Sequence, residues 1–169
     1  MTTTFFAQPY DITAAGFYFE TLEEYRLKAN ALRNDHGEVV EEFEIQFIDG
    51  EEIDCALSKA ASLSQANLGD VLKAIDDWSE EDKLRFIVGV EYCSVSFDLS
   101  RDDPNELDVD IYHLASLREL AEQFVDDGIC GDIPEAMRFY FDYDAFARDL
   151  GMDYFEVEIA GQRLVCRCA

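Results

Sequence analysis

Positive charge is scarce in this chain, and long apolar runs are absent. Only 13 of its 169 residues are Lys or Arg and 2 are His, against 38 Asp or Glu, so the formal net charge is −25. Such a charge repels nucleic acid and anionic membranes, which excludes direct binding to either. Because the sequence has no stretch of about eighteen apolar residues and no basic leader, we expect a cytoplasmic protein whose partners present basic surfaces.

The sequence also lacks the motifs that carry catalysis or hold a cofactor. It has no G-x-S-x-G, H-E-x-x-H, G-x-G-x-x-G or P-loop pattern, so we expect a protein that is not an enzyme and binds no cofactor. Its five cysteines include no C-x-x-C pair, and we therefore expect no metal site. Cys55, Cys93 and Cys130 are expected to pack as small apolar side chains in a reducing compartment.

The composition is nevertheless that of a folded chain. Hydrophobic residues make up 49% and aromatic residues 13%, with only 3 Pro and 9 Gly. A disordered acidic segment has too few apolar side chains to build a core. The sequence therefore predicts a packed interior despite the charge.

The first part of the chain has the pattern of a small sheet with one helix. Residues 16–19 are mostly aromatic, which suits a strand. Thr21 and Glu24 have the spacing of a capping box and predict the start of a helix. Residues 42–48 alternate polar and apolar side chains, which is typical of a strand with one buried and one wet face.

The middle of the chain has a helical period. Leu68, Val71, Leu72, Ile75 and Trp78 share one face of a predicted helix. Asn67 is in position to cap that helix, and Ser79 to cap the next one. Residues 91–103 fit either a strand, from their alternating apolar residues, or a loop, from their serines and aspartates.

The last part returns to a mixed pattern. Residues 107–112 alternate as a strand, and Ser116 begins a helix with a second capping box. Pro134 is placed to begin a short helix and Asp142 to cap another. Residues 154–166 have the pattern of a closing hairpin.

These elements predict an α+β fold built as a chain of three small, segregated units. Residues 1–56 form a small sheet with a helix, residues 57–105 a mainly helical middle unit, and residues 106–169 a C-terminal α+β unit with a dimer interface. Small antiparallel sheets with helices thus flank the helical middle.

The acidic residues are gathered into stretches without a single base. No Lys or Arg occurs in residues 34–58, 102–117 or 119–137. In the strands predicted at 42–48 and 107–112 the carboxylates alternate with core residues, so folding places them on solvent. The acids expected to form a partner-binding surface are Glu38, Glu41, Glu42, Glu44, Asp49, Glu51, Glu52, Asp54, Asp76, Asp77, Glu80, Glu81, Asp102, Asp103, Asp108, Asp110, Glu119, Glu122, Asp126 and Asp127.

The amount of charge matches a short DNA duplex. B-form DNA carries about one charge per 1.7 Å of axis, so a net charge of −25 corresponds to roughly 42 Å of duplex, or about twelve base pairs. One strand cannot supply this density, because its outward side chains repeat only every roughly 6.7 Å. The alternative interpretation is an acidic, salt-adapted or cation-associated interaction domain, whose carboxylates form a solvated face.

Residues 131–150 carry a specific resemblance. Pro134, Tyr140, Asp142, Tyr143, Ala145, Arg148, Asp149 and Leu150 fit the most recognisable segment of the ArdA-type antirestriction proteins. Ala147 stands where that family usually has Gly. Met137 and Phe146 share the helical spacing of these aromatics, and the whole segment is expected to serve core or subunit packing.

The resemblance implies what the protein does. It implies an elongated, three-domain homodimer joined through the C-terminal unit. Such a dimer mimics duplex DNA and inhibits type I restriction-modification enzymes by occupying the DNA-binding site of their DNA-recognition and methyltransferase core. A DNA mimic directed at another DNA-binding protein remains an alternative. The aromatic density of residues 139–146 independently favours a homodimer, since aromatic side chains are enriched in interface cores.

Overall fold

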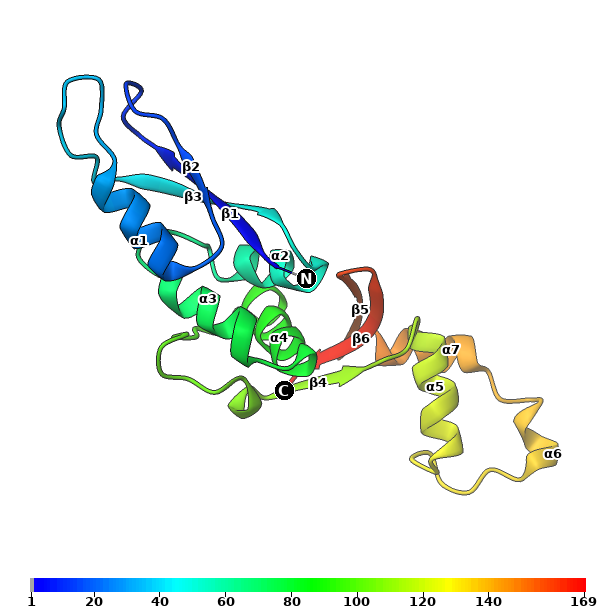
Figure 1. The fold of residues 1–169 in the computed structure, drawn as a ribbon. Coiled ribbons are helices and arrows are strands. Elements are labelled where there is room, and N and C mark those ends of the chain that lie inside the picture. Colours follow the sequence, from blue (N-terminus) through cyan, green and yellow to red (C-terminus); the bar gives the residue numbers. More distant parts are fainter. Residues whose placement is uncertain (1) are drawn as a thin grey trace. The chain divides into compact units, whose positions relative to one another are not determined.

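The computed structural model describes residues 2–169 and confirms the α+β class. This part of the chain forms seven α-helices and two antiparallel sheets of three strands each. It divides into two compact units, of which the first ends at Glu106 and the second begins at Leu107 (Figure 1). The first unit contains both the N-terminal sheet and the helical segment, and a division of these two into separate units stays a prediction.

The first sheet has the strand order β2-β1-β3 with α1 against it, which agrees with the expected small sheet and single helix. Its elements are β1 (Thr4–Pro9), β2 (Phe17–Phe19), α1 (Leu22–Ala31) and β3 (Phe43–Asp49). Tyr25 of α1 packs on the rings of Phe17, Phe19 and Phe43. Aromatic side chains therefore form the layer between the helix and the sheet.

The start of α1 follows the predicted capping pattern in part. The Thr21 hydroxyl accepts a hydrogen bond from the Glu24 backbone N–H at 3.1 Å. The Glu24 carboxylate, however, accepts from the backbone N–H of Glu20 at 2.9 Å rather than from that of Thr21. The first bond satisfies a donor that the first helical turn would leave free, and the second ties the helix to the residue before its cap.

Three helices complete the first unit. They are α2 (Glu52–Ala60), α3 (Leu68–Asp77) and α4 (Glu80–Ile87). Ser79 and Asp82 form a full capping box at the start of α4. Asn67 occupies the cap position of α3, but its side chain bonds Ser64 and Ala61 instead, so the expected side-chain cap is wrong.

Residues 91–103 are irregular, which decides between the two interpretations of that segment. A π-helical turn, Val88–Tyr92, continues α4, and Pro104–Glu106 forms a 3-10 turn. Between them the chain has no strand. Phe97 packs on the rings of Trp78 and Phe86, so its apolar character reflects packing against helices rather than a sheet.

The second unit combines one sheet, of order β4-β6-β5, with three helices. Its elements are β4 (Val109–Tyr112), α5 (Leu117–Asp126), α6 (Glu135–Arg138), α7 (Tyr143–Leu150), β5 (Tyr154–Ile159) and β6 (Gln162–Cys168). Gly128, with φ +74°, ends α5, where the Ile129 N–H bonds the Phe124 carbonyl oxygen at 3.0 Å. This is a Schellman ending.

The hairpin between β5 and β6 turns through two residues. Ala160 and Gly161 have φ of 50° and 74°, as the twist of a two-residue hairpin requires. Val165 of β6 is buried against Leu120 and Phe124 of α5, and Phe146 and Leu150 of α7 pack around them. Helices α5 and α7 therefore form the inner layer over this sheet.

Three cysteines differ from expectation: Cys93 is disulfide-bonded rather than a free thiol, and Cys55 and Cys130 do not pack in a core. Cys55 and Cys130 are exposed, whereas Cys166 is fully buried. Cys55 lies on the outer face of α2 and Cys130 follows the end of α5, so neither side chain reaches a core.

In residues 2–169 no helix is long and apolar enough to cross a membrane.

A buried ion pair joins α2 to α4. Lys83 Nζ lies 2.6 Å from Asp54 Oδ1, and the two side chains are only 8% and 6% exposed. A lone buried charge is strongly unfavourable, so each partner depends on the other. The pair also fixes which face of each helix points inward.

Replacing Lys83 by Met should lower the free energy of unfolding by about 3–5 kcal/mol, because Asp54 would stay buried without its partner. Urea unfolding measures this change. The double variant Lys83→Met with Asp54→Leu should recover most of the loss, since a buried pair can be replaced by apolar side chains. Lys59→Met, at an exposed position on α2, is the control. A loss below about 1 kcal/mol for Lys83→Met would contradict a coupled buried pair.

Candidate partner-binding surface

Strand β3 and the segment before it hold the first group of predicted acids. Phe43 and Ile45 are buried, so the alternating residues Glu42 and Glu44 face solvent. The Phe43 backbone N–H donates to the Gln65 side chain at 3.0 Å, and Gln65 donates to the Glu41 carbonyl oxygen at 2.9 Å. The backbone that carries these acids is therefore held in place, while the carboxylates remain outside.

The next acids surround the start of α2. Asp49 ends β3, Glu51 is the N-cap of α2 and Glu52 is its first residue, and all three are exposed. Negative charge in a first helical turn interacts favourably with the helix dipole. None of the three carboxylates forms an ion pair with a described residue, so their charge faces solvent.

Asp54 does not belong to this surface, contrary to prediction. It is 4% exposed and is paired with Lys83. The reason is helical geometry: Asp54 shares the inner face of α2 with Leu57 and Ser58, both buried. The sequence around Asp54 does not indicate this ion pair, because the stretch contains no base and Lys83 belongs to a different helix.

Two acids end α3, and two begin α4. Asp76 and Asp77 lie in the last turn of α3, which contains no basic residue, and both are exposed. Carboxylates at a helix C-terminus interact unfavourably with the helix dipole, typically by 0.3–1 kcal/mol each. Glu80 and Glu81 in the first turn of α4 are exposed in the favourable position. The placement of Asp76 and Asp77 thus does not serve helix stability.

Asp102 and Asp103 are exposed in the irregular segment before β4. Asp102 accepts a hydrogen bond from the Asp98 backbone N–H at 2.7 Å, and Asp103 accepts from the Asn105 N–H at 2.9 Å. Hydrogen bonds from Ser100 hold the pKa of Asp98 below its usual value. These carboxylates shape the loop as well as charging it.

In the second unit, arginines neutralise several of the predicted acids. Asp110 is half-buried and lies 2.6 Å from Arg167. Glu122 pairs with Arg118 at 3.1 Å, and Asp126 pairs with Arg138. These three acids, like Glu81 of α4, which lies 3.8 Å from Arg85, are therefore weaker candidates for binding a partner than the exposed acids of residues 34–58.

The remaining predicted acids of the second unit are all exposed. Asp108 precedes β4, and Asp127 caps the C-terminus of α5. Glu119 lies in the first turn of α5, where its carboxylate accepts from the Ala115 backbone N–H at 2.7 Å. Glu119 thus has a structural role beside any contact with a partner.

The motif residues of the C-terminal unit divide into two groups. Phe146 and Leu150 pack against the unit's own core, and Tyr143 contacts the ring of Phe141 with centroids 4.9 Å apart. Asp142 caps α7, as predicted, by accepting from the Ala145 N–H at 2.9 Å. Tyr140, in contrast, belongs to the exposed group, since its side chain is 83% exposed.

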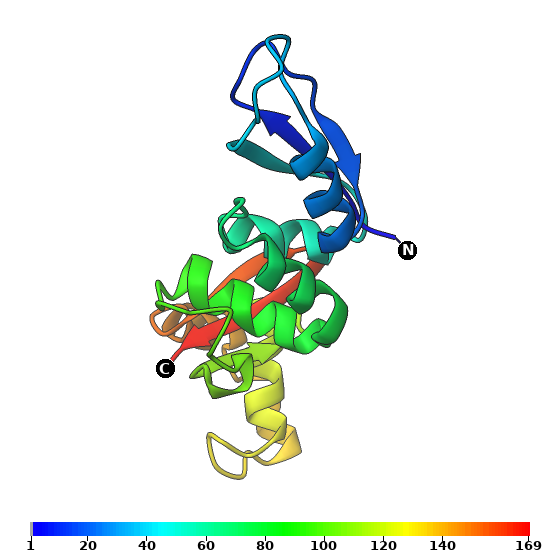
Figure 2. The same ribbon diagram turned by 60° about the vertical axis from the view of Figure 1, so that its left-hand side comes forward.

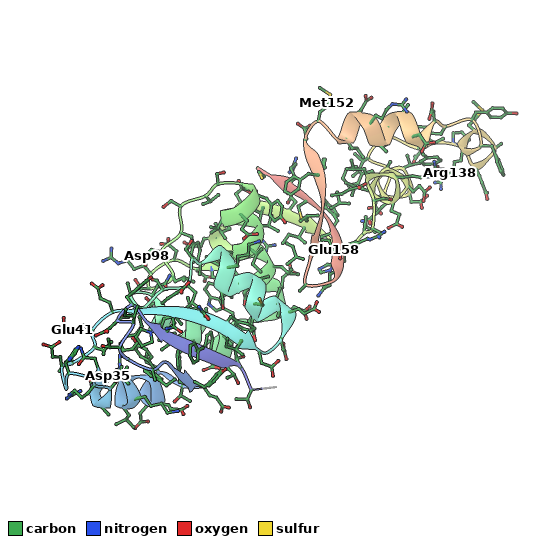
Figure 3. The ribbon with its side chains drawn as sticks, turned by 90° about the horizontal axis from the view of Figure 1, so that it is seen from above. Asp35, Glu41, Asp98, Arg138, Met152 and Glu158 are labelled. Carbon is green, nitrogen blue, oxygen red and sulfur yellow. The ribbon has the colours of Figure 1, made fainter. Side chains whose placement is uncertain are left out.

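The other motif residues lie on the surface. Met137, in α6, is 55% exposed, and Pro134 caps that helix from an exposed position. Arg148 and Asp149 are exposed near the end of α7. Phe139, which follows α6 directly, is 94% exposed. Figure 3 labels Arg138, the last residue of α6.

Sequence reasoning missed a hydrogen-bond network between the β1–β2 loop and the α1–β3 loop of the first unit. Asn34 Nδ2 donates to Asp11 Oδ2 at 2.9 Å and to Glu38 Oε2 at 3.1 Å. Hydrogen bonds from Asn34 and then Thr13 hold the pKa of Asp11 below its usual value, so Asp11 is a carboxylate at neutral pH. The Asp-x-Thr spacing of Asp11 and Thr13, typical of a side-chain-capped turn, could have indicated half of this network.

The structure brings no metal-binding constellation together in residues 2–169, where no three His, Cys, Asp or Glu side chains are grouped to hold an ion. The exposed carboxylates instead form an extended set, from the loop at Asp35 and Glu41 (labelled in Figure 3) to the helices of the first unit. Such a set can contact a basic surface at many points.

A search of curated proteins found no match to the chain. The family model described as "Antirestriction protein (ArdA)" matches residues 6–161. The match covers nearly the whole chain, far beyond the twenty residues of the C-terminal motif. The chain therefore belongs to the ArdA family of antirestriction proteins.

Proposed function

We propose that the protein inhibits type I restriction-modification enzymes by occupying the DNA-binding site of their DNA-recognition and methyltransferase core. The observation that carries this proposal is the base-free stretch 34–58, whose carboxylates, except that of the buried Asp54, are exposed on a hydrogen-bonded backbone. Apart from Asp54, these acids form no ion pairs with described residues. They take the place of DNA phosphates and pair with Lys and Arg side chains of the enzyme.

The placement of charge on the helices supports a partner-facing role. Asp76 and Asp77 lie where the dipole of α3 disfavours them. A protein whose acids served only its own solubility or salt tolerance would gain nothing from that position. When a cationic partner surface binds there, it offsets the unfavourable interaction between these two carboxylates and the helix dipole.

The binding energy of such a surface is shared among many carboxylates. An exposed ion pair contributes roughly 0–1 kcal/mol and is screened by salt. Single substitutions should therefore be almost silent, whereas neutralising a whole group should not. The salt dependence of binding should be gentler than that of DNA, since spaced carboxylates condense fewer counterions than phosphates.

We also propose that the protein is a homodimer joined through its C-terminal unit. The apolar side chains in α6 and directly after it support this: Phe139 and Tyr140 are 94% and 83% exposed, and Met137 is 55% exposed. Grouped exposed apolar residues mark interaction sites. Two chains of −25 each would present a charge equal to roughly 85 Å of duplex.

The first prediction is that the protein and duplex DNA exclude each other from a type I methyltransferase core. Displacement of labelled DNA by the protein, measured by fluorescence anisotropy, checks it. Simultaneous binding of both without loss of affinity would contradict mimicry. If the protein displaces DNA equally from unrelated basic proteins and has no preference for the type I enzyme, the target is another DNA-binding protein or the surface is only an acidic domain.

The second prediction concerns the acids around β3 and α2. Changing Glu41, Glu42, Glu44, Glu51 and Glu52 together to Gln should weaken binding about 100-fold or more, because five pairs of roughly 0.5–1 kcal/mol are lost. Each single change should weaken it less than about fivefold. Titration calorimetry measures both.

The matched control changes the same five residues to Asp, which keeps their charge and should largely keep binding. Because the Gln variant removes like-charge repulsion, its thermal unfolding temperature should be equal to or above that of the wild type. If one Glu→Gln change alone abolished binding in a folded protein, a discrete site would replace the distributed surface.

The third prediction tests the dimer. Changing Phe139 and Tyr140 together to Ser should shift the protein to monomer, and more completely at low salt, where repulsion between two acidic chains is least screened. Light scattering over a range of concentrations measures the shift. Exposed Met152→Ser, outside α6, is the control. A wild-type protein that stays monomeric at high concentration and moderate salt would refute the dimer.

A further inference from the structure

The loop between β1 and β2 presents an aliphatic side chain to water. Ile12 is 98% exposed, and Tyr10 in the same loop is 66% exposed. Val39, in the loop between α1 and β3, is 57% exposed. Figures 1 and 2 both show these two loops side by side at one end of the first unit.

The loop that carries Ile12 is held rigidly. Asp11 Oδ1 accepts from the backbone N–H of Thr13 at 2.8 Å and from its hydroxyl at 2.7 Å. The Ala14 N–H donates to the Asp11 carbonyl oxygen at 3.1 Å. Ile12 therefore sits at the centre of a turn closed on both sides by hydrogen bonds.

The same loop is tied to the acidic segment beside it. Asn34 bridges Asp11 and Glu38, and the Asp35 N–H donates to the Thr13 carbonyl oxygen at 3.1 Å. The Tyr10 N–H donates to the Glu42 carbonyl oxygen at 3.1 Å. The position of Ile12 is thus fixed relative to the carboxylates of Glu38, Glu41 and Glu42, which belong to the proposed binding surface.

The charge around the loop of residues 10–14, here called the tip, restricts which kind of partner can bind Ile12. Asp11, Asp35 and Glu38 lie in the two hydrogen-bonded loops, while Arg33, at the start of the second loop, donates from Nη1 to the carbonyl oxygens of Asn30 and Leu32 at 2.8 and 2.7 Å. Like-charge repulsion disfavours an anionic membrane or a second copy of the tip. A surface that accepts this tip must be apolar at its centre and basic at its rim.

A DNA-binding groove has this chemistry. Apolar side chains in such grooves contact thymine methyl groups, while neighbouring Lys and Arg side chains contact phosphates. We propose that Ile12 is an apolar anchor that inserts between the basic side chains of the same DNA-binding groove that the carboxylates occupy. This inference rests on the proposed function and adds to it a contact that does not depend on charge.

An anchor held in its bound position loses little freedom on binding, and a central apolar contact ringed by polar ones is typical of an energetic hot spot. Because apolar contacts are not screened by salt, Ile12 should contribute equally at low and high ionic strength. The carboxylates should contribute mainly at low ionic strength. The two contributions can therefore be separated by experiment.

The test measures binding of the full-length protein to a type I methyltransferase core at about 0.1 M and about 0.4 M salt, between which screening increases strongly. Ile12→Ser should weaken binding about tenfold at both salt concentrations, equivalent to about 1.4 kcal/mol. Ile12→Leu, which keeps the apolar side chain, should bind like the wild type. Leu27→Ser, at a 66% exposed position in α1 outside the two loops, is the matched control and should change binding less than twofold.

Three outcomes would overturn the anchor. Binding of Ile12→Ser equal to that of the wild type would show that the tip makes no contact, while DNA competition by the wild type would leave the proposed function standing. An equal loss for Leu27→Ser would show a general effect of removing surface aliphatics. If the wild-type protein failed to bind the methyltransferase at all, the proposed function would fall, and the anchor with it.

Discussion

Repulsion among carboxylates is the constraint on which the rest of this structure depends. With 38 acids and 13 Lys or Arg, the chain cannot neutralise itself, so its acids must be spread over the outside and its interior must be strongly apolar. In the first unit this apolar interior contains stacked aromatic rings: the ring centroid of Phe5 lies 5.5 Å from that of Phe19 and 5.6 Å from that of Phe47. In the second unit the interior contains Leu120, Phe124 and Val165.

The few bases pair with acids in both units. In the second unit Arg118, Arg138 and Arg167 each pair with an acid of that unit. In the first unit Lys28, Arg85 and Arg101 pair with acids on the surface, and Lys83 pairs with Asp54 inside, where it joins two helices. The stretch 34–58 retains a row of acids without counterions, and it lies beside a rigid loop with an exposed Ile12. Charge and apolar anchor together give this unit the features of a binding surface.

Local patterns in the sequence predicted much of the fold. The alternation in β3, the Ser79 helix cap and the hairpin of residues 154–166 each depend on neighbouring residues, and each was confirmed. The choice between strand and loop at 91–103 depended on the packing of Phe97 against Trp78 and Phe86, which the local pattern does not contain. The side-chain cap expected of Asn67 was wrong because its side chain bonds the preceding residues Ser64 and Ala61 instead.

The candidate site was predictable in type but not in detail. Base-free stretches located the acids, yet pairing with distant residues removed Asp54 and weakened Asp110, and sequence spacing contains no record of such pairs. The network of Asp11, Asn34 and Glu38 was missed for the same reason, because it joins residues from separate loops. Family membership, in contrast, could be inferred from twenty residues and extends to residues 6–161.

The central claim is that the carboxylates of this protein contact the side chains that otherwise contact DNA phosphates. Lysine acetylation footprinting of a type I methyltransferase core, alone, with its DNA site and with this protein, tests that claim directly. We predict that the lysines protected by DNA and those protected by the protein are largely the same set. Protection of a separate set, with the DNA-protected lysines still reactive, would contradict the account.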